Sequence, residues 1–184
     1  MILVFTLDIV LILLSYMRRN TQIEEYIEKE TTIDALTGAL NRKSGEDFLS
    51  TTFQQFQRGE QSPLIMMLDL DNFKKTNDTY GHDVGDEVLK RTTKEILKNI
   101  RSSDKFFRWG GEEFVLIFNG VDKDYDRTLS DKILSCVNQL QFETSKGTFS
   151  TSISIGSAWY RPTDTSWHQA LKRADMALYH SKGS

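Results

Sequence analysis

RWGGEEF, residues 108–114, is the stretch that decides how this chain folds. Its two glycines stand between apolar residues at 106–107 and the apolar run 114–118. A glycine pair flanked by apolar strand residues is a signal for a β-hairpin, because glycine adopts the backbone angles of tight turns. We therefore predict two strands joined at Gly110 and Gly111, with the carboxylates of Glu112 and Glu113 beside the turn.

A second acidic position follows a buried strand. The run LIMML at 64–68 is apolar throughout, as expected of a strand covered on both faces, and it leads into Asp69-Leu70-Asp71. Unpaired buried charge is costly, so these carboxylates need a partner. If this strand neighbours the hairpin, Asp69 and Glu112 form a hard oxygen site suited to Mg²⁺. Paired metals of this kind clamp the oxygens in phosphoryl and nucleotidyl transfer. An acidic strand end alone, or a glycine-pair turn alone, more often has a structural role.

The remaining periodicity predicts a layered fold. Several segments carry apolar residues at helical spacing, and the last strand alternates at period two. The order helix, strand, helix, hairpin, helix, strand, helix predicts an α/β sheet with helices packed on it. The expected helices cover 41–58, with Asn41 as a possible cap, 86–100, 125–140 and 167–181; the expected strands cover 64–68, 106–107, 114–118 and 149–160.

Composition excludes several classes. The 23 basic and 26 acidic residues are well mixed and give a net charge of −3, which argues against a nucleic-acid partner. Cys136 is the single cysteine, so neither a disulfide within the chain nor a thiolate zinc site is possible. We expect this thiol to be a small buried apolar group.

The N-terminus has a different character. Residues 1–16 are apolar apart from three positions, and two arginines at 18–19 follow. The run is borderline for a transmembrane helix, which usually needs about 20 residues. Positive charge after the run differs from a secretory signal and predicts a cytoplasmic C-terminal side. We favour a transmembrane helix over residues 1–17, as the C-terminal end of a segment that spans the cytoplasmic membrane of a bacterium. The alternative is a helix that is buried or packed against a partner.

A short linker then leads to the globular domain, which we expect over 34–184. Within 18–33, Ile23, Tyr26, Glu30 and Ile33 follow steps of three and four residues, as in a coiled-coil seam. The segment is either a signalling helix or an ordinary exposed linker helix.

The acidic motifs together match a family. DLDNFKKTND at 69–78, GHDVGD at 81–86 and RWGGEEF at 108–114 resemble the GGDEF domain of diguanylate cyclases in order and spacing. DALTGALNR at 34–42 and ADMALY at 174–179 also fit, so the resemblance covers about 32–184. It implies an α+β fold: a palm-like, ferredoxin-type sheet flanked by helices, similar to class III nucleotidyl cyclase domains.

The resemblance implies condensation of two GTP molecules into cyclic di-GMP. Asp69, the Leu70 carbonyl and Glu112 would hold two Mg²⁺ ions per site, with Mn²⁺ as a substitute. Glu112 would accept the proton of the attacking hydroxyl, assisted by Glu113, and Lys74 would neutralise phosphate charge. One domain holds one GTP, so a homodimer is expected.

The same resemblance assigns the nucleotide contacts. A carboxylate and an amide can together read the donors and acceptors of guanine. A Gly-Arg-Asn segment usually follows in the family, and its absence by residue 184 implies a C-terminally truncated domain with weaker GTP binding. The residues expected to contact GTP are Asn77, His82, Asp86, Arg108, Gly110, Gly111 and Lys182, with Asn77 and Asp86 on guanine and Arg108 and Lys182 on phosphate. His82 could instead cap a helix or pack against it.

Arg101 and Asp104 match the RxxD product-binding site of many cyclases of this family. Arginine can fork onto phosphate and Asp can accept from guanine, so we expect product inhibition here. The alternative is an ordinary surface pair. For the whole chain, the alternatives to an enzyme are a nucleotide receptor module and a structural dimerisation module.

Overall fold

The computed structural model describes residues 13, 16–17 and 32–182. The transmembrane segment predicted over 1–17 and the linker helix predicted over 18–33 lie almost entirely outside the described residues. Among the helices that are described, none has both the length and the apolar character needed to cross a membrane. Residues from Ile33 onward form one compact unit.

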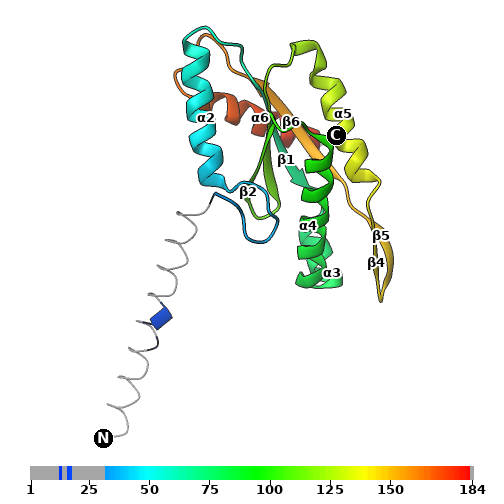
Figure 1. The fold of residues 1–184 in the computed structure, drawn as a ribbon. Coiled ribbons are helices and arrows are strands. Elements are labelled where there is room, and N and C mark those ends of the chain that lie inside the picture. The colour runs from blue at the N-terminus through cyan, green and yellow to red at the C-terminus, as the bar shows by residue number, and fades with distance from the viewer. Residues whose placement is uncertain (1–12, 14–15, 18–31, 183–184) are drawn as a thin grey trace, which may run out of the picture. The chain divides into compact units, whose positions relative to one another are not determined.

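Four antiparallel strands form the central sheet, in the order β2-β3-β1-β6. They are β1 (Leu64–Leu70), β2 (Lys105–Gly110), β3 (Glu113–Phe118) and β6 (Ile153–Trp159). This is the strand order of the ferredoxin-like fold. The first strand, β1, lies inside the sheet and pairs with the last of the four, β6, which forms one edge. The α+β class and the pairing of the acidic strand with the hairpin are confirmed (Figure 1).

Helices cover both faces of the sheet, as Figure 1 shows. Side chains alternate between the faces of a strand, so β1 contributes to two separate apolar cores. Its residues Leu64, Met66, Leu68 and Leu70 pack with one core, and Ile65 and Met67 with the other. The first core uses α3 (Phe73–Tyr80), α4 (His82–Asn99) and α5 (Asp126–Asn138); the second uses α2 (Arg42–Gln57) and α6 (Trp167–Lys182).

The predicted N-cap of α2 is present: the Asn41 side chain accepts a hydrogen bond from the Ser44 N–H. The prediction of one strand over 149–160 was wrong. The segment divides into β5 (Gly147–Ser150), which pairs with β4 (Gln141–Thr144) in a separate hairpin, and β6. The period-two pattern runs through the break at Thr151 and Ser152, so it could not reveal the division.

Tyr160 anchors the second core through a buried hydroxyl. It lies 3.0 Å from the Thr52 hydroxyl, donates to the Leu49 carbonyl at 3.0 Å, and is 2% exposed. Burial raises the pKa of Tyr160 to about 12. We expect Tyr160→Phe to lower the free energy of unfolding by about 1–2 kcal/mol, because a buried polar network loses a member. Urea unfolding measures this, and an equal effect of Tyr179→Phe, whose side chain is 77% exposed, would contradict it.

Candidate active site

Asp69 at the end of β1 and Glu113 on β3 place two carboxylates on one face of the sheet. Asp69 is opposite Glu113 of β3 on one side and Ser154 of β6 on the other. Directly opposed residues in antiparallel strands project to the same face. Asp69 is only 8% exposed, so its charge is partly removed from water. The sequence paired Asp69 with Glu112, but the register places Glu113 directly across from it.

The hairpin tip is held in place by main-chain and guanidinium contacts. The Leu70 N–H donates to the Glu112 carbonyl at 3.3 Å, which ties the tip to the end of β1. The Arg108 Nε and Nη2 donate to the Gly111 carbonyl at 3.1 and 2.9 Å. Its Nη1 donates to Asp34 Oδ1 at 3.0 Å. Arg108 therefore supports the turn, and its predicted phosphate contact stays a prediction.

Asp34 gives this support a pH dependence. Burial raises the pKa of its carboxyl, but hydrogen bonds from Thr37 and the Arg108 guanidinium outweigh burial and hold the pKa below its usual range. Because the pKa of Asp34 is depressed in the folded state, its stabilising effect is fully present above the ordinary carboxyl pKa near 4. The effect is lost as the pH falls through the folded-state pKa. We expect Asp34→Asn to lower unfolding free energy by about 1–2 kcal/mol at pH 7. That difference should shrink below about pH 4 in thermal unfolding; a constant difference at all pH values would contradict it.

The two glycines leave room beside the hairpin. Gly111 has φ 49°, a left-handed conformation that favours glycine. Apart from its chain neighbours, a Cβ placed on Gly110 or on Gly111 would meet no atom of the described residues within 4 Å. The backbone at the turn therefore faces open space, and a ligand can approach it closely.

The charges at this edge of the sheet interact. Desolvation, followed by the charges of Asp69 and Asp175, raises the pKa of Glu113 above its usual range. Glu112 adds to the rise, and the Lys182 ammonium opposes it. By surface area Glu113 is an exposed residue, so solvent screens part of this effect. A carboxylate with a raised pKa is a better proton acceptor. Asp175 was not singled out from the sequence, although it lies in the quoted ADMALY motif.

A cation already lies against Asp69. The Lys182 Nζ is 2.7 Å from Asp69 Oδ1, yet this oxygen has no hydrogen bond within the described part of the chain, so the contact is an ion pair without hydrogen-bond alignment. Such an oxygen fits a hard metal ion. Among the described residues no three acidic, His or Cys side chains are grouped as metal ligands. The predicted set needs only two carboxylates and a main-chain carbonyl, and Mg²⁺ typically completes its shell with water and phosphate.

Asp71 has a structural role. Its carboxylate accepts hydrogen bonds from the hydroxyls of Ser152 at 2.6 Å and Ser154 at 2.7 Å. Its N–H donates to the Ser152 carbonyl at 2.9 Å. Asp71 thereby ties the end of β1 to β6. A pocket of about 410 Å³ opens here, lined by Asp71, Asn72, Ser152, Ser154, Ser181 and Lys182.

The residues predicted to bind guanine lie on two consecutive helices that are joined by a short turn. Asn77 lies on α3, and His82 and Asp86 lie in the first turns of α4. Among the described residues, the Asn77 Oδ1 has no hydrogen-bond partner, and it is buried against Gly85. Gly85 makes this placement possible, since a Cβ there would lie 1.9 Å from the Asn77 Oδ1. Lys74 is exposed in the first turn of α3.

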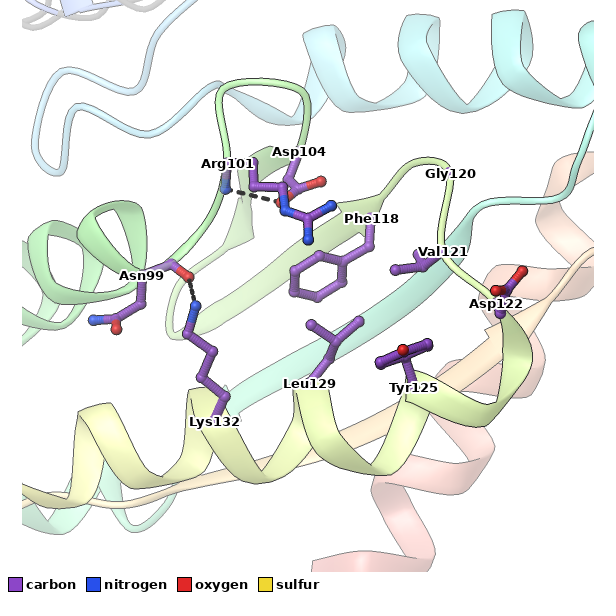
Figure 2. A pocket seen from close by; sticks show the side chains of 10 residues that line it. All are labelled: Asn99, Arg101, Asp104, Phe118, Gly120, Val121, Asp122, Tyr125, Leu129 and Lys132. Atoms are coloured by element: carbon purple, nitrogen blue, oxygen red, sulfur yellow. Dashed lines mark hydrogen bonds between the residues drawn. The ribbon is translucent and has the colours of Figure 1, made fainter.

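Arg101 and Asp104 form a tight turn at the rim of a pocket of about 250 Å³ (Figure 2). The Arg101 N–H donates to Asp104 Oδ2 at 2.9 Å, and the Asp104 N–H donates to the Arg101 carbonyl at 3.0 Å. Main-chain N–H groups therefore hold this turn, and the Arg101 guanidinium takes no part in holding Asp104. Lys132 of α5, which sequence reasoning did not single out, also lines the pocket. Its apolar lining comes from Phe118, Val121, Tyr125 and Leu129.

The antiparallel sheet flanked by helices, with carboxylates at the end of β1 beside a glycine hairpin, has the palm-like fold of solved cyclase domains. Within that class, residues 31–184 match the family model described as "Diguanylate cyclase, GGDEF domain". The chain belongs to the GGDEF domain family.

Named relatives agree. The chain is 34% identical over 152 residues to the probable diguanylate cyclase DgcC of Escherichia coli, covering 83% of this chain and 41% of that protein. It is 37% identical over 165 residues to diguanylate cyclase DgcS of Shewanella oneidensis, covering 90% and 54%. The chain thus spans about two fifths to one half of the length of these curated relatives.

Solved structures show the same fold. The GGDEF domain of DgcB from Caulobacter crescentus, solved in complex with c-di-GMP, superposes with a TM-score of 0.78 at 32% identity, covering 83% of this chain and 88% of that one. Diguanylate cyclase SiaD from Pseudomonas aeruginosa, in complex with its activator SiaC, gives 0.79 at 30% identity, covering 96% and 67%.

Proposed function

We propose that this chain is a diguanylate cyclase, which condenses two GTP molecules into cyclic di-GMP and two pyrophosphates. The observation that carries the proposal is the pairing of Asp69 with Glu113 across two strands, beneath a glycine turn that faces open space. The named relatives support the same reaction.

Each residue has a task in this reaction. Asp69, Glu112 and the Leu70 carbonyl would hold Mg²⁺ or Mn²⁺, which would lower the pKa of the 3′-hydroxyl and offset phosphate charge. Glu112 accepts the hydroxyl proton, assisted by Glu113. Lys74 and Lys182 neutralise charge on the phosphates as pyrophosphate leaves.

Turnover needs two copies of the domain. Each 3′-hydroxyl attacks the α-phosphorus of the other GTP, so two P–O bonds form and two pyrophosphates leave. A site that holds one GTP must therefore face a second site, and a twofold axis achieves this with one kind of surface. The segment over 18–33 would raise the effective concentration of the two domains.

The test is incubation of the purified chain with GTP and Mg²⁺, followed by chromatography for cyclic di-GMP. We expect product formation whose rate per chain rises with protein concentration, because two domains must meet. A sample shown to be dimeric and able to bind GTP, yet without product, would favour the receptor function instead.

We further propose product inhibition through Arg101 and Asp104. The exposed Arg101 side chain, the buried Asp104 and the adjoining pocket provide groups that can hold phosphate and guanine. We expect Arg101→Ala to weaken cyclic di-GMP binding by about tenfold or more, as loss of a charged hydrogen bond does, and to relieve inhibition. Calorimetry and progress curves measure both; an unchanged affinity would refute the site.

We also propose that residues 1–17 attach the chain to the cytoplasmic membrane of a bacterium, with the catalytic domain in the cytoplasm. The apolar run and the arginines that follow it support this placement. Fractionation of cells that express the chain tests it, since recovery with the soluble fraction would overturn the proposal.

A further inference from the structure

The β4–β5 hairpin lies apart from the central sheet, beside α3 and α4 (Figure 1). Its two phenylalanines, Phe142 and Phe149, are directly opposite in the register and therefore share one face of the hairpin. Phe142 is 2% exposed and belongs to the core that α4 and α5 also build. The hairpin is thus anchored by one aromatic face, and its other face is exposed.

This aromatic face stacks on the end of α3. The rings of Tyr80, the last residue of α3, and Phe149 are parallel within 8°, with centroids 4.4 Å apart. The Phe149 and Phe142 centroids are 5.3 Å apart. The Arg91 guanidinium of α4 lies 4.5 Å from the Phe142 centroid, within cation–π range. A continuous stack therefore runs from α3 through the hairpin to α4.

A polar contact from the hairpin tip reaches the same place. The Lys146 Nζ donates to the Thr79 carbonyl, in the last turn of α3. Carbonyls in a last helical turn lack partners within the helix, so this bond satisfies one of them. The tip is itself held by Thr144, whose hydroxyl accepts from the Lys146 N–H at 3.1 Å and donates to the Gly147 carbonyl at 2.8 Å.

Both contacts fall on the elbow between α3 and α4. Gly81 forms this elbow with φ 95°, and its N–H donates to the Asn77 carbonyl at 2.9 Å. The elbow separates Asn77 from His82 and Asp86, so its angle decides whether these side chains converge on one base. A contact that fixes Thr79 and Tyr80 fixes this angle from outside.

We infer that the β4–β5 hairpin is a positioning element for guanine recognition, holding the α3–α4 elbow through Tyr80 and Lys146. This inference rests on the proposed function, because it takes Asn77 and Asp86 as the guanine contacts. Without the hairpin contacts, a smaller fraction of molecules has the binding-competent elbow, and apparent affinity falls by that fraction. Once GTP is bound it holds the elbow itself, so the rate at saturation is unaffected.

The test compares three single variants. We expect Tyr80→Ala to raise the KM for GTP roughly three- to tenfold, as loss of an aromatic stack does, with kcat unchanged. Tyr80→Phe keeps the ring and should restore wild-type KM. Thr148→Ala changes an exposed residue on the same hairpin and should leave KM unchanged. A wild-type KM for Tyr80→Ala, or a KM raised equally by Thr148→Ala, would overturn the inference.

Amide hydrogen exchange tests the same inference without nucleotide. Residues 77–86 should exchange faster in Tyr80→Ala and in Lys146→Met than in the wild type, while β1 and β3 exchange at the wild-type rate. Unchanged exchange across 77–86 in both variants would overturn the inference. If the wild type makes no cyclic di-GMP, the proposed function fails, and the exchange result still decides whether the hairpin holds the elbow.

Discussion

Asp69→Asn should reduce the rate of cyclic di-GMP formation by about 10²–10³-fold, the range typical of removing one group that stabilises charge in the transition state. The two side chains have nearly the same shape, so the strand register with Glu113 and Ser154 is kept. The substitution removes a negative charge from a residue that is 8% exposed and whose carboxylate contacts the Lys182 ammonium. Neutral amide oxygen binds hard cations more weakly than carboxylate does.

Turnover at saturating GTP and Mg²⁺ measures the effect, with the unfolding midpoint as a check on the fold. Asp71→Asn is the matched control, because its carboxylate is two residues away and accepts two serine hydrogen bonds. We expect this control to lower unfolding free energy by about 1–2 kcal/mol and to change turnover far less than Asp69→Asn. Equal loss of turnover in both variants would show that Asp69 has no special role.

Features with local signals could be predicted from the sequence. The apolar run before Asp69 is buried throughout in β1, and the glycine pair closes the β2–β3 hairpin. The Asn41 cap and the helix expected over 167–181, which is α6 in the structure, follow from short-range patterns too. These patterns work because each is decided by residues within a few positions of each other.

Features that depend on distant contacts could not be predicted. α3 was missed because its eight residues are largely polar and only Phe73 is buried. α4 begins at His82, four residues before the expected start, since Gly81 supplies the turn. The ion pair of Arg108 with Asp34 joins residues that are 74 positions apart. Nothing in either local segment identifies the other, so Arg108 was assigned to phosphate from the family resemblance alone.

Gly156 is the position where one added methyl group should most damage the fold. A Cβ on this residue of β6 would lie 2.1 Å from the Leu178 nitrogen and 2.2 Å from the Ala174 carbonyl oxygen. Both are backbone atoms of α6, so no side-chain rotation can relieve the clash. α6 would have to move off the sheet, which separates Ala174 and Leu178 from the core that they share with Ala158.

We therefore expect Gly156→Ala to lower the free energy of unfolding by about 3 kcal/mol or more, at or beyond the upper range for overpacked cores. Urea unfolding measures this. Gly110→Ala is the matched control because a Cβ there meets no atom of the described residues within 4 Å, apart from its chain neighbours. Similar midpoints for the two variants would contradict the close approach of α6 to β6. Lys182 ends α6 and contacts Asp69, so displacement of the helix should also weaken GTP binding in Gly156→Ala molecules that remain folded. The same glycine thus links the packing of the sheet to the position of a charge in the candidate active site.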